Sequence, residues 1–198
     1  MSESLILASS SIFRRQILDR AGLLFTAHAA DLPEDEMMLD WQKKGTTAEH
    51  VARELSVAKA MKISAKFPGA HVIGCDQMML CQDRWFAKPK SRAEAAEHLQ
   101  FLSGKTHRLI SGIAVVRNGK VLWDHVDIAN MTMRPLNQNT IDNYLDEMGD
   151  KVLQSVGCYQ IEGLGIQLFD KIEGDFFGIV GLPLLPLLQF LRAQKVIA

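Results

Sequence analysis

Short apolar runs alternate with amphipathic stretches along the first half of the chain. The first run is typical of a buried strand, and apolar residues then recur at helical spacing, with Ile17, Leu18 and Ala21 on one face. A Thr-Thr pair offers the N-cap of a longer helix, which Phe67-Pro68-Gly69 ends. The pattern predicts a strand over 5–8, a helix over 11–21, a strand over 25–29, an acidic loop over 31–36 and a helix from 46 or 47 to 66.

The second half of the chain is richer in strands and hairpins. An apolar strand from His71 to Gly74 leads to Asp76. Ser91 and Glu94 form a capping box, and Asn118-Gly119 between two β-rich runs is a strong hairpin signal. The other expected elements are a hairpin around 83–84, a helix ending at 102, strands over 107–117 and 121–133, a helix over 137–148, short strands over 165–169 and 171–172, and a last helix from 182–186 to 193.

This order of elements indicates an α/β fold with a mixed sheet and flanking helices. Strand–helix alternation fails after residue 104, so a doubly wound parallel sheet is not expected. No internal repeat, low-complexity tract or linker divides the chain. We therefore expect a single domain over residues 1–198, with room for two lobes around a central cleft.

Composition narrows the class of protein. The 198 residues are 47% hydrophobic and 23% charged, with a formal net charge of −1, so no strong field favours nucleic acid or an anionic membrane. Three scattered cysteines form neither a disulfide framework nor a zinc pattern. No signal-peptide pattern opens the chain, and glycines and prolines break the longest apolar stretch, 176–188. We expect a cytoplasmic protein that binds neither nucleic acid nor membrane.

The first strand-to-helix junction has features of a phosphate-binding site. Three serines, including Ser9, precede a helix whose N-terminus carries partial positive charge and unpaired N–H groups. Arg14 adds a planar cation suited to phosphate oxygens. The alternative is a serine that only caps the helix and an arginine that only meets solvent.

Several other polar residues are candidates for chemistry. Asp76 follows an apolar strand, where ligands collect in α/β proteins, and an aspartate that caps a turn is the alternative. Lys88 precedes a capped helix, and Lys59 lies among apolar neighbours, where a snorkelling surface lysine is the alternative. Glu34 belongs to the acidic stretch and Glu162 to a glycine-rich turn, and for both the alternative is a merely solvated loop.

The arrangement of these residues along the chain resembles the Maf family of nucleoside triphosphate pyrophosphatases. The resemblance covers nearly the whole chain and rests on several short motifs in order. They are the opening LASSSIFRR, Glu34, Lys59 in AKA, IGCDQ at 73–77, AKP at 87–89, LSGKTH at 102–107, IEGLGI at 161–166 and VGLPL at 180–184. The fold that the resemblance implies is a Maf/ITPase-like one.

The resemblance implies hydrolysis between the α- and β-phosphates of a nucleotide, with a divalent cation, Mg²⁺ or Mn²⁺. Asp76 matches the family's general base, which would orient and deprotonate water or hold the metal. Glu34 matches an acidic position that would share the metal. The remaining matches are phosphate contacts, among which the two lysines are also expected to take part in catalysis; these residues are Ser9, Arg14, Lys59 and Lys88.

Three departures from the common family pattern indicate the branch that prefers 7-methyl-GTP. Phe13 replaces the first arginine of the opening motif, Gln77 stands where the dTTP/UTP branch has threonine, and Glu162 stands where that branch has glutamine. A positively charged 7-methylguanine would stack on an aromatic ring, though that branch usually has tryptophan in place of Phe13. A carboxylate could accept guanine N1–H and N2–H₂ together, which thymine cannot match.

Three alternatives stay open at this point. The first is a dTTP/UTP pyrophosphatase of the same family. The second is a non-catalytic nucleotide-binding regulator of septum formation, although a pure binder has no need of Asp76 and Glu34 beside Lys59 and Lys88. The third is an enzyme acting on inosine or xanthosine triphosphates, against which the SSSIFRR opening argues. The resemblance and the frequency of two-fold oligomers both favour a homodimer.

Overall fold

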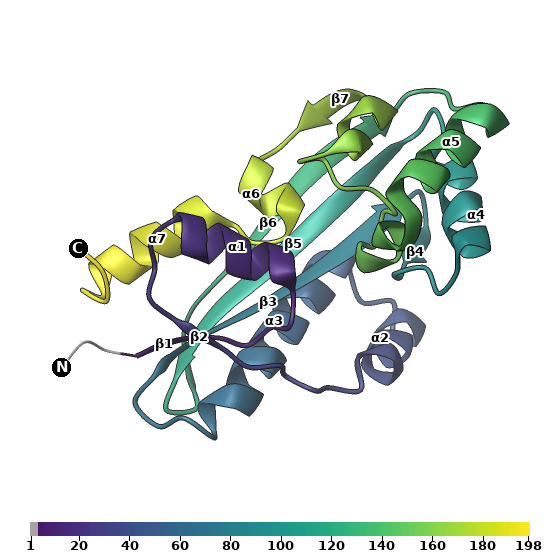
Figure 1. Ribbon diagram of the computed structural model, residues 1–198. Helices are drawn as coiled ribbons and strands as arrows, with labels where there is room; N and C mark the ends of the chain where they lie inside the picture. Colours follow the sequence, from purple (N-terminus) through teal and green to yellow (C-terminus); the bar gives the residue numbers. More distant parts are fainter. Residues whose placement is uncertain (1–3) are drawn as a thin grey trace. The chain divides into compact units, whose positions relative to one another are not determined.

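The computed structural model describes residues 4–198, which form an α/β fold around one mixed sheet (Figure 1). The seven strands follow the order β2-β1-β3-β5-β6-β7, with β4 paired to β3. Strand β1 is parallel to β2 and β3, whereas β3/β4 and β6/β7 are antiparallel. The expected α/β class with a mixed sheet and flanking helices is therefore confirmed. The strands are β1 (Leu5–Leu7), β2 (Thr26–Ala27), β3 (His71–Cys81), β4 (Arg84–Phe86), β5 (Thr106–Arg117), β6 (Lys120–Met133) and β7 (Phe169–Glu173).

Most helix starts carry side-chain caps, and the sequence indicated those at Ser11, Thr47 and Ser91. Ser11, Thr47, Ser91 and Asn137 each accept a hydrogen bond from the backbone N–H three residues on. The helices are α1 (Ile12–Arg20), α2 (Glu34–Lys43), α3 (Ala48–Ser64), α4 (Arg92–Leu102), α5 (Gln138–Met148), α6 (Phe176–Val180) and α7 (Leu184–Ala193), with 3₁₀ turns η1 (Gly149–Gln154) and η2 (Leu164–Leu168).

The contacts divide the chain into two compact units. The first holds the described residues up to Gln77 together with Ile110–Asp127 and Asp175–Ala198, and the second holds Met78–Leu109 and Ile128–Gly174. Strands β3, β5 and β6 each pass from one unit into the other. A single Maf-like domain over residues 1–198 with two lobes around a cleft stays a prediction.

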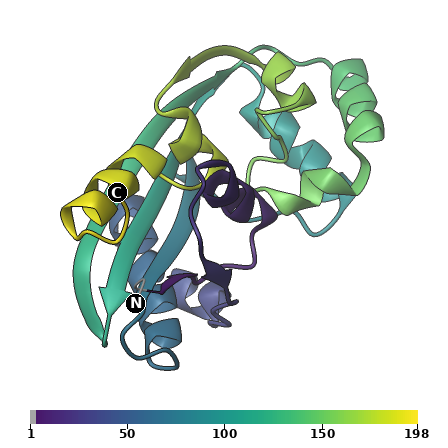
Figure 2. The same ribbon diagram turned by 60° about the vertical axis from the view of Figure 1, so that its left-hand side comes forward.

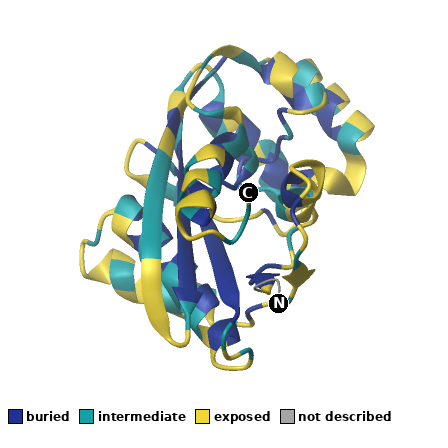
Figure 3. Ribbon diagram, turned by 90° about the vertical axis from the view of Figure 1, so that its left-hand side faces the viewer, coloured by how far each residue is buried: buried dark blue, intermediate teal, exposed yellow. Residues whose placement is uncertain are grey.

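The first unit has three layers. Alternate residues of β1 and β3 point to opposite faces, because side chains alternate along a strand. Ile6 and Val72 pack with Ala60 and Ile63 of α3 on one face. On the other face, Leu7, Ile73 and Cys75 pack with side chains of α1 and α7, and these two helices lie side by side (Figures 1 and 2). The middle strands are buried along nearly their whole length (Figure 3). Helices α1 and α3 are thus fixed against opposite faces of the sheet.

The second unit contains α4, α5 and the parts of β3, β5 and β6 that lie within residues 78–109 and 128–174. Leu99 and Leu102 of α4 and Ile141 and Leu145 of α5 are buried, and the two helices are in contact. Its interior also holds polar side chains, among them His98 and His107.

Several expected elements are wrong. The acidic stretch is not a loop throughout: after Pro33 it becomes the first turn of α2, where carboxylates interact favourably with the helix dipole. Strand β3 does not end before Asp76 but continues to Cys81. Residues 164–168 form a 3₁₀ turn rather than a strand, and the only strand of that region among the described residues is β7. Helix α6 was not foreseen, because Gly178 and Gly181 obscure its short pattern.

None of the helices described in residues 4–198 is both long enough and apolar enough to cross a membrane.

Candidate functional site

Two glycines on neighbouring strands allow α3 to lie very close to the sheet. A Cβ atom at Gly74 of β3 would lie 2.0 Å from the Ser56 carbonyl oxygen, and one at Gly112 of β5 would lie 2.2 Å from the Ala52 carbonyl oxygen. Asp76 lies two residues beyond Gly74 and faces the same helix. The close approach brings Lys59 of α3 within 2.6 Å of the Asp76 carboxylate.

Lys59 joins two carboxylates. Its Nζ donates to Asp76 Oδ1 at 2.6 Å and to Glu34 Oε2 at 2.9 Å. The Lys59 and Asp76 side chains are each 10% exposed, whereas Glu34 is 38% exposed. The buried lysine is therefore paired rather than snorkelling, as a charge in this position requires. Lys59 contacts one oxygen of each carboxylate and leaves the other uncontacted by the lysine. Solvent reaches the site at the Glu34 side chain.

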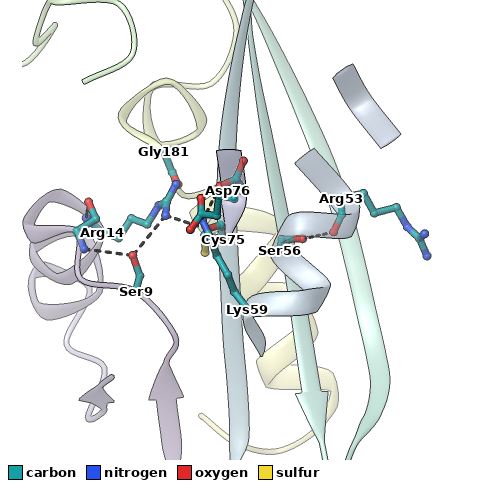
Figure 4. A network of polar contacts seen from close by, with 10 residues as sticks. Ser9, Arg14, Arg53, Ser56, Lys59, Cys75, Asp76 and Gly181 are labelled. Atoms are coloured by element: carbon teal, nitrogen blue, oxygen red, sulfur yellow. Dashed lines mark hydrogen bonds and ion pairs between the residues drawn. The ribbon is translucent and has the colours of Figure 1, made fainter. Parts of the chain in front are cut away.

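Arg14 reaches the same part of β3 from the other helix layer (Figure 4). Its Nη1 donates to the Cys75 carbonyl at 2.8 Å and to Ser9 Oγ at 3.3 Å, and its Nε donates to the Gly181 carbonyl at 2.8 Å. Ser9 Oγ also accepts from the Ser11 N–H at 3.2 Å. Arg14 is therefore not simply solvated: it ties the start of α1 to the residue before Asp76.

Gln77 follows Asp76 and points to the opposite face of the sheet. Its side-chain nitrogen lies 2.9 Å from Ser111 Oγ, 3.1 Å from the Gly178 carbonyl and 3.0 Å from the Ile179 carbonyl. The amide N–H groups are thus used within the first unit. Any contact with a ligand would come from the side-chain oxygen of Gln77.

The structure brings together five of the predicted residues in the first unit: Ser9, Arg14, Glu34, Lys59 and Asp76. Phe13 is half-buried in the first turn of α1, next to Arg14.

Lys88 and Glu162 belong to the second unit, where both are exposed. Lys88 lies between β4 and α4, and Glu162 lies in a turn just before η2. Their part in the site stays a prediction.

The position of Asp76 differs from the expectation that drew attention to it. It lies inside an 11-residue strand, not at the end of one. Strand β1 pairs with β3 only as far as Ile73, and β4 pairs only from Met79 onward. Asp76 therefore falls between these two pairings, where the partner strand has already left. Because β1 and β4 both stop short of Asp76, this residue has the kind of position that residues beyond the end of a strand have in a parallel sheet.

Sequence reasoning missed the hydrogen-bond partners of Arg14 and Gln77. These are the Cys75 and Gly181 carbonyls, Ser111, and the carbonyls of α6. Backbone acceptors carry no side-chain signal, although the VGLPL motif does contain Gly181. Cys75 itself is not a nucleophile, because burial raises the pKa of its thiol to about 11 and keeps it protonated near neutral pH.

The donor set suits a metal that also binds substrate. Among the described residues, no group of three or more His, Cys, Asp and Glu side chains is placed to hold an ion. Asp76 and Glu34 nevertheless offer carboxylate oxygens on either side of Lys59. Mg²⁺ commonly takes one or two carboxylates and completes its shell with phosphate oxygens and water. The residues therefore fit such an ion when a phosphate is present.

The chain is similar to known proteins over almost its whole length. The chain is 53% identical over 192 residues to a 7-methyl-GTP pyrophosphatase of Rhizobium etli, covering 97% of this chain and 96% of the relative. It is 50% identical over 197 residues to a 7-methyl-GTP pyrophosphatase of Brucella abortus, covering 100% and 99%. It is 49% identical over 197 residues to a nucleoside triphosphate pyrophosphatase of Nitrobacter winogradskyi, covering 100% and 96%. Residues 4–194 match the family described as Maf-like protein, and the chain belongs to this Maf family.

Proposed function

We propose that this protein is a nucleoside triphosphate pyrophosphatase that cleaves the α–β phosphoanhydride of 7-methyl-GTP to the monophosphate and pyrophosphate. The observation that carries the proposal is the Asp76–Lys59–Glu34 cluster, with Arg14 bound to the residue next to Asp76. A carboxylate base and cations in one place are what phosphoanhydride hydrolysis requires.

The residues divide the work as follows. Asp76 accepts the proton of the attacking water, and Lys59 holds this carboxylate at one oxygen, which leaves the other for the water. Arg14 already uses Nε and Nη1 within the protein, so its Nη2 edge meets a phosphate oxygen. Ser9 contacts the neighbouring Nη1 at the start of α1, whose N-terminal N–H groups add to the positive potential. Lys88 is the further cation that the family resemblance implies.

Asp76 and Glu34 would hold the divalent cation, Mg²⁺ or Mn²⁺. The ion would neutralise negative charge on the phosphate oxygens. The protein as a whole does not do this, because its formal net charge is −1. Because Lys59 lies between the two carboxylates, it keeps their repulsion low before the ion binds.

The preference for 7-methyl-GTP rests on Phe13, Gln77 and Glu162. Phe13 in the first turn of α1 provides an aromatic face for a cationic base. Glu162 accepts the two N–H groups of the guanine edge, and Gln77 contributes its side-chain oxygen. The names of the relatives in Rhizobium etli and Brucella abortus support this substrate.

Turnover of a nucleotide panel tests the function. The purified protein is incubated with Mg²⁺ or Mn²⁺ and 7-methyl-GTP, GTP, dTTP, UTP, CTP, ATP or ITP, and pyrophosphate and monophosphate are measured separately. We expect pyrophosphate release to be greatest with 7-methyl-GTP and to be lost in Asp76→Asn. A maximum with dTTP and UTP would overturn the substrate preference but keep the activity. Binding without turnover of any nucleotide would indicate a regulator instead.

We also propose that the enzyme is a cytoplasmic homodimer that acts on free nucleotides rather than on nucleic acid. The near-neutral net charge supports the absence of a nucleic-acid partner, and the frequency of two-fold assemblies supports the dimer. Light scattering after size-exclusion chromatography distinguishes a dimer from the 22.1 kDa monomer.

A further inference from the structure

Both residues that flank Asp76 are held in place by the same short segment of chain. On one side, the Cys75 carbonyl accepts a hydrogen bond from Arg14, which also donates to the Gly181 carbonyl. On the other side, the Gln77 side chain donates to the Ile179 carbonyl at 3.0 Å, and its nitrogen also lies 3.1 Å from the Gly178 carbonyl. We call residues 178–181 the α6 turn. It is connected to β3 before Asp76 through Arg14 and after Asp76 through Gln77.

Ser111 of β5 connects Gln77 to the α6 turn. It is 1% exposed, and its Oγ lies 2.7 Å from the Gly178 carbonyl and 2.9 Å from the Gln77 side-chain nitrogen. The hydroxyl has one proton, which goes to the carbonyl because a carbonyl cannot donate. Ser111 Oγ therefore accepts from Gln77. This leaves the second amide proton of Gln77 for the Ile179 carbonyl, 3.0 Å away.

Ser111 does not itself contact the substrate, because it is 1% exposed and its hydroxyl is already bonded to the Gly178 carbonyl and the Gln77 amide. Side chains alternate along β3, so Gln77 and its partner Ser111 lie on the face of the sheet opposite to Asp76 and Lys59. Any effect of Ser111 on hydrolysis must therefore pass through Gln77, the α6 turn and the backbone of β3.

We propose that Ser111 is a positioning residue that, through Gln77 and the α6 turn, fixes the Asp76 carboxylate in its reactive position. This inference rests on the proposed function. The buried hydroxyl orients the Gln77 amide, and the amide keeps the α6 turn where Arg14 reaches Gly181 and Cys75 together. Small displacements of a catalytic group reduce the rate far more than they reduce substrate binding.

Ser111→Ala removes the hydroxyl without adding bulk, and two readouts follow it. We expect kcat for the preferred nucleotide to fall about tenfold while KM stays within about twofold. In the free protein, we expect faster hydrogen–deuterium exchange in the peptide covering 176–182. Ser111→Thr keeps the hydroxyl and should recover kcat to within about threefold of the wild type.

Ser64→Ala is the matched control. Ser64 is also a buried serine of the first unit, and its Oγ accepts one hydrogen bond, from the Gly119 N–H at 3.2 Å. It should change neither kcat nor exchange over 176–182. Wild-type kcat in Ser111→Ala, or unchanged exchange over 176–182, would overturn the proposal. A wild-type protein without turnover would instead overturn the proposed function, while the exchange data would still decide whether Ser111 holds the α6 turn.

Discussion

Lys59 is the residue on which the charge balance of the site depends. It lies with Asp76 where water reaches only about a tenth of either side chain, so each charge needs the other. In Lys59→Met, the Asp76 carboxylate is left without its partner, and we expect the free energy of unfolding to fall by about 3 kcal/mol and hydrolysis to be lost. Urea unfolding measures the first effect and pyrophosphate release the second.

An exposed pair gives the comparison for this prediction. Lys44 and Asp40 are also 2.6 Å apart, but their side chains are 65% and 59% exposed. Lys44→Met should change stability by less than about 1 kcal/mol and leave activity unchanged. The double variant Lys59→Met/Asp76→Asn should regain most of the stability but none of the activity. Equal losses in Lys44→Met and Lys59→Met would contradict the role of burial.

Glu162 carries the prediction on substrate choice. Glutamine at this position has the same shape but replaces one acceptor oxygen with a donor, so it can no longer accept two guanine N–H groups. In Glu162→Gln, we expect kcat/KM for 7-methyl-GTP to fall at least tenfold relative to kcat/KM for UTP, as judged by competition between the two nucleotides. Glu173→Gln, at another exposed glutamate of the second unit, should leave the ratio unchanged. An unchanged ratio in Glu162→Gln would remove this residue from the specificity argument.

At the level of elements, the contact of α3 with the sheet determines how far Lys59 reaches. Gly74 leaves no room for a side chain, because its Cβ would overlap the Ser56 carbonyl. In Gly74→Ala, α3 must therefore move outward, and we expect a loss of about 1–3 kcal/mol in stability together with a fall of at least tenfold in kcat. Thermal unfolding and steady-state kinetics check the two effects.

Gly22→Ala separates packing from backbone strain. Gly22 has φ +74°, and no neighbouring atom lies within 4 Å of the place that a Cβ atom would take, so alanine there meets strain but no clash. It should lower stability by about 1 kcal/mol and leave kcat unchanged. A fall in kcat as large as that of Gly74→Ala would show that the α3 contact has no special part in the chemistry.

The sequence predicts most elements here because their ends carry side-chain signals. The caps of α1, α3 and α4 and the Asn118-Gly119 hairpin are all read from residue types, and φ at Asn118 and Gly119 is +51° and +69° as that turn requires. Helix α2 lacks a side-chain cap, and the residues of β3 beyond Gly74 give no signal of where its neighbours stop. Tertiary pairing decides both of these features.

The same division applies to the candidate site. Side chains such as Asp76, Arg14 and Gln77 were identified through motifs, whereas the partners of Arg14 and Gln77 in the structure include backbone carbonyls of Cys75, Gly181 and α6. Such acceptors are the same in every residue, so no residue type points to them. Only the three-dimensional structure shows that Arg14 and Gln77 both donate hydrogen bonds to the α6 turn.

For the molecule as a whole, His107 in the second unit links stability to pH. Its ring is 1% exposed, its Nε2 lies 2.6 Å from Tyr159 Oη, and burial lowers its pKa from 6.5 to about 4. Burial lowers the pKa of His98 in the same unit as well. Between pH 6.5 and 4, the unfolded chain therefore binds more protons at these positions than the folded protein does.

Stability should consequently rise with pH across this range and be lost as the pH falls toward 4. For His107 alone, the shift corresponds to as much as about 3 kcal/mol. We expect His107→Gln to be less stable than the wild type at pH 7, because it loses the Tyr159 contact, but to show a flatter dependence of the free energy of unfolding on pH between 6.5 and 4. His50→Gln, at an exposed position, should keep the wild-type slope. Urea unfolding at half-unit pH intervals measures the slopes, and equal slopes in His107→Gln and the wild type would show that folding does not lower the pKa of His107.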